Sequence, residues 1–250
     1  MNSIYKIAFY FLVFLASGKQ FAQHHSQLSV EVNLEHKTLN IQQEITFFNQ
    51  SNDSLTAIIL NNWNNAYSDK NTPLGRRFSD EFYRGFHLAK EEERGSTKNL
   101  TIIAPNKLFL NWKRTKKNPD YIEVELREKL APKQKITLYL TYTVKVPSDK
   151  FTKYGYTDAG GMNLKDWFIT PARYENNAFL TYSNNNLDDA ANAVSDFDID
   201  IKIPRNTALT TDLNHGPQSQ SKSFSTYQLT GKNRTDFSLF IEPKSTFHSY

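Results

Sequence analysis

Alternation of apolar and polar residues with a period of two is the feature that most constrains this chain. Residues 28–34 read Leu-Ser-Val-Glu-Val-Asn-Leu, and residues 39–48 continue the alternation after a turn near His36 and Lys37. Successive side chains of a β-strand point to opposite faces, so this pattern predicts strands with one buried and one solvent-facing side. We expect the two segments to form an antiparallel hairpin.

The same pattern recurs between turn-forming residues along most of the sequence. Further strands are expected at residues 55–63, 100–104, 108–112, 121–126, 136–146, 167–170, 179–182, 197–203, 208–211, 224–229 and 237–241. No long segment has the 3.6-residue apolar period of a helix. About a dozen short strands predict an all-β, mostly antiparallel sandwich.

Two segments interrupt the alternation. Residues 64–98 are polar and charged, and their aromatic side chains have a spacing that predicts one or two amphipathic helical turns over a sheet end. Those aromatic residues are Phe78, Phe82, Tyr83 and Phe86. Residues 150–166 are glycine-rich and predict an irregular crossing between two halves. Because no linker or internal repeat divides the chain, residues 23–250 are expected to form one domain.

The first 22 residues have the layout of a secretory signal peptide. Lys6 supplies a positive charge, residues 7–16 are an unbroken apolar run, and small or polar residues follow up to an expected cleavage site near Ala22 and Gln23. A run of this length covers roughly 15 Å as a helix, about half of a bilayer's hydrocarbon core. The sequence therefore predicts an exported protein, periplasmic, cell-surface or secreted, with no membrane span in its mature form.

The charge balance argues against nucleic acid as a partner. The chain has 30 basic and 26 acidic residues. Removal of Lys6 and Lys19 with the signal peptide leaves 28 against 26, a net charge of +2, too small to steer a polyanion. The densest basic run, residues 113–117 beside Trp112, is interpreted as a solvated hairpin tip.

The sequence contains no complete active site. It has no cysteine, which excludes disulfides and thiolate chemistry. It has six histidines but no His-Glu-x-x-His motif, and His24 and His25 are expected in a frayed N-terminus. Asp196, Asp198 and Asp200 share one strand face, where neighbours lie roughly 6–7 Å apart, too far to chelate one ion without help. We therefore expect no catalytic and no metal-binding residues here.

Residues 167–174, Trp-Phe-Ile-Thr-Pro-Ala-Arg-Tyr, are the most unusual segment. A proline in a strand-like run predicts a sheet edge or a bulge, which often borders a cleft. The aromatic residues are also compatible with a plug in the core. Both interpretations remain open on sequence alone.

Several segments follow one another in a characteristic order. They are the signal peptide, the alternating pair 28–48, residues 60–67 (Leu-Asn-Asn-Trp-Asn-Asn-Ala-Tyr) with 69–74, the glycine-rich 154–163, and residues 167–174, 197–204 and 237–243. Each segment is only moderately specific, but their order resembles that of the N-terminal β domain of secreted bacterial M1-family (gluzincin, aminopeptidase N-like) metallopeptidases.

This resemblance implies a saddle-shaped β-sandwich that packs on a thermolysin-like catalytic domain, in cis or as a separate chain, and caps the channel of a peptide substrate. Zinc would be bound in that other domain, so the chain alone would be inactive. The implied channel rim comprises Asn163, Asp166, Trp167, Arg173 and Tyr174. The family often places a Gln or Glu shortly before this strand to hold the substrate amine, where this sequence has Met162, Asn163 and Asp166.

A second hypothesis comes from the class of binding modules. A stand-alone exported β-sandwich could recognise glycans or peptides through exposed aromatic side chains, because aromatic rings suit the apolar faces of sugars. The candidates for this role are Trp63, Trp112 and Trp167.

Overall fold

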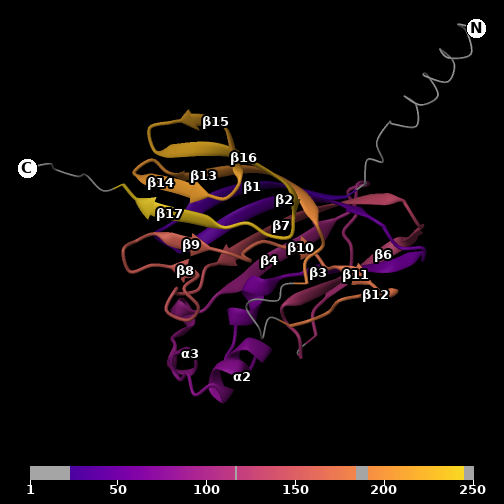
Figure 1. Cartoon of the computed structure of the whole chain (residues 1–250), viewed down its shortest axis with the longest axis horizontal. Coiled ribbons are helices and arrows are strands. Elements are labelled where there is room, and N and C mark those ends of the chain that lie inside the picture. Colours follow the sequence, from indigo (N-terminus) through magenta and orange to yellow (C-terminus); the bar gives the residue numbers. More distant parts are fainter. Residues whose placement is uncertain (1–22, 116, 184–190, 245–250) are drawn as a thin grey trace, which may run out of the picture.

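The computed structural model describes residues 23–115, 117–183 and 191–244 (Figure 1). The expected signal peptide, residues 1–22, lies outside these ranges. Within them, strands dominate and several sheets are stacked, which confirms the predicted all-β sandwich. No helix in the described part is long and apolar enough to cross a membrane.

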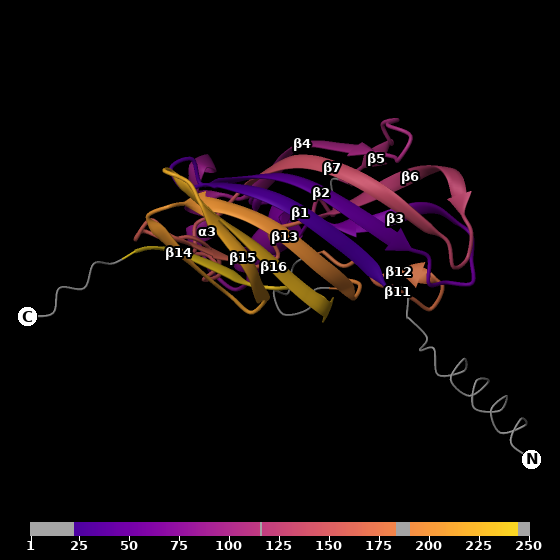
Figure 2. The ribbon, with the colours of Figure 1, turned by 90° about the horizontal axis from the view of Figure 1, so that it is seen from above.

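One large sheet forms the outer layer and arches over the rest of the molecule (Figure 2). Its seven strands, in spatial order, are β15 (Asn214–Gln220), β16 (Phe224–Arg234), β13 (Ser195–Pro204), β1 (His24–Asn33), β2 (Thr38–Phe48), β7 (Lys135–Lys145) and β4 (Ser96–Ile103). The predicted hairpin is confirmed as β1 and β2, with Val30 opposite Ile41.

Smaller sheets cover the inner face of this layer. One contains β10 (Thr170–Pro171), β3 (Leu55–Asn61), β6 (Tyr121–Leu130) and β5 (Trp112–Lys113), and another contains β14 (Thr207–Thr211), β17 (Leu239–Pro243), β9 (Met162–Leu164) and β8 (Gly155–Tyr156). A two-stranded ribbon joins β11 (Tyr174–Glu175) to β12 (Ala178–Phe179). One apolar core lies between the layers, because alternate residues of the large sheet point toward them.

The neighbour of β1 on its other side is β13, and this pair is parallel. Leu28 lies opposite Ile199 and Val30 opposite Ile201, and all four side chains are buried. The other strand pairs among the named strands are antiparallel, which agrees with the predicted topology class. The parallel pair was not predicted, since period-two alternation does not specify which strand lies beside which.

Three of the expected strands are wrong or much shorter than predicted. Residues 108–112 contribute only the start of β5, because Leu108 and Phe109 are exposed after a turn that places Lys107 at φ 62°. Residues 167–169 are buried one after another rather than alternately, and the ladder begins only at Thr170. β12 is likewise only two residues long.

The expected helical turns are present and form a helical lobe, which we define as residues 63–93. It contains η1 (Trp63–Tyr67), α2 (Pro73–Asp80), α3 (Gly85–Leu88) and η2 (Glu91–Glu93). The Thr72 hydroxyl accepts a hydrogen bond from the Gly75 N–H at 3.1 Å and caps α2, whose first residue is a proline. Of the four aromatic residues whose spacing predicted these turns, Phe78 and Phe86 are buried, whereas Phe82 is exposed to solvent.

The expectation of a frayed N-terminus at His24 is wrong. His24 is the first residue of β1, is only 4% exposed and packs on the Phe47 ring with centroids 4.6 Å apart. Its Nδ1 accepts a hydrogen bond from the Phe48 N–H at 3.2 Å. Because β13 and β2 flank this position on both sides, the imidazole is held away from water, and burial lowers the pKa of His24 to about 4.

This buried imidazole predicts a pH dependence of stability. Between pH 4 and 6.5 the unfolded chain protonates His24 and the folded chain does not, so the free energy of unfolding falls as pH decreases through this window. The contribution is at most about 3 kcal/mol. Urea unfolding at pH 4.5 and pH 7 is expected to show that His24→Phe loses less stability on acidification than the native chain. Equal losses in both proteins would contradict this assignment.

Candidate functional site

The five residues of the predicted channel rim lie in two separate places. Asn163 is in β9, with Asp166 and Trp167 directly after it, whereas Arg173 and Tyr174 lie at β11 toward the other end of the molecule (Figure 1). Residues 167–172, which are buried, connect the two places. The segment 167–174, which we call the octapeptide, therefore runs through the core from the end of β9 to β11.

At the first place, Asp166 is the chemically distinctive residue. Its backbone has φ 53°, a left-handed conformation that Asp tolerates better than most residues. Its Oδ1 is buried and has no hydrogen-bond partner in the described structure. Burial, reinforced by nearby Asp236 and opposed by Lys165, raises the pKa of Asp166 to about 6. Asn163 lies closer to solvent and its Nδ2 donates to the Lys153 carbonyl at 3.3 Å.

Trp167 belongs to the core rather than to the surface. It is 2% exposed and lies in an aromatic cluster whose other members are Phe168, Phe197 and Phe237. The rings of Phe168 and Phe237 are stacked, with centroids 4.5 Å apart. Both interpretations of residues 167–174 apply, each to a different part of the segment. Trp167 and Phe168 fill the core as an aromatic plug, whereas Pro171 lies in an edge strand and pairs with Leu60.

At the second place, Arg173 and Tyr174 have local partners. Arg173 Nη1 lies 3.4 Å from Glu175 Oε1, and the Tyr174 hydroxyl lies 3.3 Å from Asp53 Oδ2. The Tyr174 ring meets Phe179 edge-on across the β11–β12 ribbon, with centroids 4.9 Å apart. Both side chains are half-buried, so each presents some polar surface to solvent.

A buried polar network that the sequence did not predict is centred on Asn192. Asn192 Oδ1 accepts hydrogen bonds from Asn61 Nδ2, Trp63 Nε1 and Thr170 Oγ1, each at 2.8 Å. Its Nδ2 donates to the Thr235 carbonyl at 3.1 Å. Through Asn192, the network connects Trp63 at the start of the helical lobe with Thr170 in the octapeptide. The unusual asparagine content of residues 60–67 indicated that this segment forms polar contacts. It could not indicate their partner, because Asn192 is remote in sequence.

The tryptophan positions bear on the binding-module hypothesis. Trp63 and Trp167 are each 2% exposed, so neither ring is available to stack on a ligand. Trp112 is half-buried, and the Arg114 guanidinium lies over it at 5.1 Å from the ring centroid. No observation on the tryptophans therefore favours a glycan platform built from these three rings.

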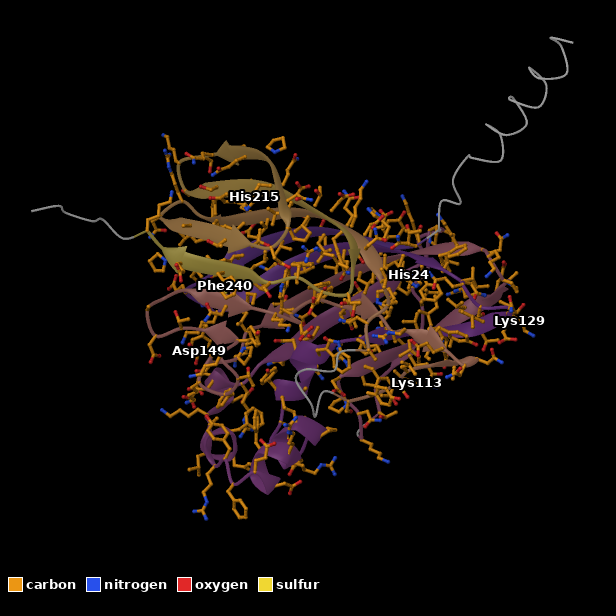
Figure 3. The ribbon with its side chains drawn as sticks, in the orientation of Figure 1. His24, Lys113, Lys129, Asp149, His215 and Phe240 are labelled. Atoms are coloured by element: carbon orange, nitrogen blue, oxygen red, sulfur yellow. The ribbon has the colours of Figure 1, made fainter. Side chains whose placement is uncertain are left out.

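No metal site is formed by the residues that the structure describes: they contain no group of three or more His, Asp or Glu side chains placed to hold an ion. His24 and His215 lie far apart on the molecule (Figure 3). Asp198 is engaged by His25 at 2.8 Å, and Asp196 accepts the Asn233 N–H at 2.9 Å. The described residues thus do not fit a catalytic zinc.

Two shallow hollows lie on the outer face of the large sheet, away from the predicted rim residues at β9 and at β11. Their volumes are about 290 and 450 Å³. Both are lined by Ser29, Gln42, Thr141 and Asp200, and none of the predicted rim residues lies in either.

Comparison with known proteins identifies the fold. No family model and no curated protein matches this chain. Among solved structures, a Glu-to-Ala mutant of the M1 zinc metallopeptidase from Deinococcus radiodurans superposes with a TM-score of 0.50 at 15% identity, over 88% of this chain and 42% of that one. The unmutated enzyme gives 0.49 at 15% over the same shares, and the mutant bound to a Tyr-Ser-Ala substrate gives 0.49 at 13% over 88% and 43%.

At this identity the match shows a shared fold and nothing finer. The chain spans about 42% of the length of the solved enzyme that it resembles.

The network around Asn192 predicts a large effect of its loss. Asn192→Ala removes the acceptor shared by three buried donors, of which only Asn61 Nδ2 keeps another, the Ala191 carbonyl at 3.0 Å. The loss is expected to lower the free energy of unfolding by about 3–5 kcal/mol. Asn40→Ala, at an exposed strand position, is the matched control and should change it by less than about 0.5 kcal/mol. Urea unfolding of both variants measures this, and similar small losses would show that the network contributes little.

Asp166 predicts a second pH effect, opposite in sign to that of His24. The folded chain keeps the Asp166 proton up to about pH 6 and the unfolded chain releases it near pH 4, so the free energy of unfolding falls as pH rises through this window. Asp166→Asn is therefore expected to stabilise the protein at pH 7 by about 1–3 kcal/mol. Asp158→Asn, in an exposed turn, is the control. A destabilised Asp166→Asn variant would refute the assignment.

Proposed function

We propose that this chain is the N-terminal β domain of an exported M1-like zinc aminopeptidase, which caps the substrate channel and packs on a catalytic domain outside this sequence. The observation that carries the proposal is the fold match over 88% of the chain to an M1 zinc metallopeptidase. The order of sequence segments from residue 28 to residue 243 supports it independently. In this proposal residues 1–22 are a signal peptide and residues 23–250 the domain.

The catalytic chemistry is assigned to the other domain. Because the described residues do not fit zinc, the contribution of this chain is geometric. It would form one wall of the channel through which a peptide reaches the metal by its free N-terminus. Partners are accordingly the thermolysin-like catalytic domain and a peptide substrate.

The channel wall is proposed to include Asn163 and Asp166 at one end of the octapeptide and Arg173 and Tyr174 at the other. Trp167 would be a positioning residue. Its ring packs on Phe168 and Phe237 in the core and thereby holds the backbone next to Asp166 in place. A carboxyl group in this wall suits a channel for peptide N-termini, because an ammonium group is attracted to a carboxylate.

The test compares two lengths of the protein. The chain of residues 23–250 is expected to release no product from aminoacyl-arylamide substrates with added zinc, whereas the same chain continued through the downstream reading frame is expected to hydrolyse them. A chelator should abolish the activity of the longer protein. Hydrolysis by the short chain, or a downstream frame without a His-Glu-x-x-His motif, would contradict the proposal.

A further inference from the structure

Two large apolar side chains stand in solvent on the helical lobe. Phe82 is 88% exposed and Leu88 is 79% exposed, the highest values among the exposed large apolar residues of the described structure. The lobe projects from the sandwich beside the small sheet that contains β8 and β9 (Figure 1). Phe82 follows the end of α2, and Leu88 is the last residue of α3.

The backbone at Phe82 makes this exposure more unusual. The Phe82 N–H donates to the Ser79 carbonyl at 3.0 Å and the Tyr83 N–H donates to the Phe78 carbonyl at 2.7 Å, which is the Schellman pattern at a helix C-terminus. Phe82 occupies its left-handed position with φ 58°, where glycine is preferred and a bulky residue is disfavoured by about 1–2 kcal/mol. Within the described structure Phe82 is both strained and without an apolar environment, so the fold itself gives no reason for a phenylalanine there.

The lobe holds these side chains on a rigid support. A second apolar core lies beneath them, formed by Ala66, Tyr67, Leu74, Phe78, Phe86 and Phe151. Phe86 meets Phe151 edge-on with centroids 5.0 Å apart, and the Tyr83 hydroxyl donates to the Lys150 carbonyl at 2.8 Å. Phe82 and Leu88 are therefore presented in a fixed geometry, which reduces the entropy lost on binding.

The lobe continues into the surface from which the chain leaves the domain. Phe151 packs under the lobe and precedes β8, which pairs with β9, which pairs with β17. On β17, Phe240 lies opposite Asn163 and is 38% exposed. Figure 3 shows Phe240 and Asp149 on the side of the molecule that carries the lobe. β17 is the last strand of the described residues and ends at Pro243.

We infer that Phe82 and Leu88 are the anchors of a docking surface for the catalytic domain, and that this surface runs from the helical lobe across β8 and β9 to Phe240 on β17. The inference rests on the proposed function. In the proposed enzyme, a catalytic domain joined to the chain after β17 would be held beside this surface at high effective concentration, so that a few apolar anchors would be enough to hold it. Burial of the Phe82 side chain also offsets the free-energy cost of its left-handed backbone conformation, because burying a large aromatic side chain removes about 150–250 Å² of surface from water.

The experiment measures amide hydrogen exchange on the full-length protein and on residues 23–250 alone. In the full-length protein, residues 78–90 are expected to exchange at least about tenfold more slowly than in the shorter chain. The double variant Phe82→Gly with Leu88→Ser is expected to lose this protection in the full-length protein. It should still fold, because glycine suits the left-handed position.

Phe109→Ser is the matched control, since Phe109 is 64% exposed on the connection to β5 and lies outside the proposed surface. It should leave the protection of residues 78–90 unchanged. If a zinc-dependent peptidase is present but residues 78–90 exchange equally in both lengths, the docking surface is wrong and the proposed function stands. A full-length protein with no catalytic domain would overturn both.

Discussion

The parallel pairing of β1 with β13 is the interaction on which the rest of the structure depends. It joins the N-terminal hairpin to strands that lie about 170 residues later, between Leu28 and Ile199 for example. Without it the large sheet would divide into β15-β16-β13 and β1-β2-β7-β4, and β13 and β1 would each become an unpaired edge. Because β1 is central, its inward side chains Leu28, Val30 and Val32 are almost completely buried, and the small sheets have one continuous apolar surface to cover.

The inner face of the large sheet is the face that packs against the rest of the molecule. The smaller sheets that cover it are positioned by strand ladders, such as that of β3 with β6, and by buried polar side chains. The Asn192 network is the clearest case, since it connects the end of β3, the start of the lobe and β10 through one amide group. A buried network of this kind specifies geometry because its polar groups are costly to leave unpaired away from water. It thus fixes the start of the lobe relative to Thr170 of β10.

Burial is the main cause of the shifted pKa values of His24 and Asp166. Neither residue belongs to a group of metal-ligating side chains among the described residues. Phe82 and Leu88 of the lobe and Phe240 of β17 are exposed apolar side chains. The proposed packing on a catalytic domain would give these side chains an apolar environment.

The sequence by itself determined the fold class, the β1–β2 hairpin and the helical turns of the lobe, because alternation and turn residues act over a few neighbouring positions. Tertiary structure alone decided the parallel β1–β13 pair and the acceptor role of Asn192, because each depends on residues more than 100 positions away. It also decided the burial of His24, which lies against Phe47 of β2 and opposite Ser195 of β13. It also separated Asn163 and Asp166 from Arg173 and Tyr174, although the octapeptide suggested one site. Spacing along the chain determines which face a side chain occupies, and only packing determines what lies opposite that face.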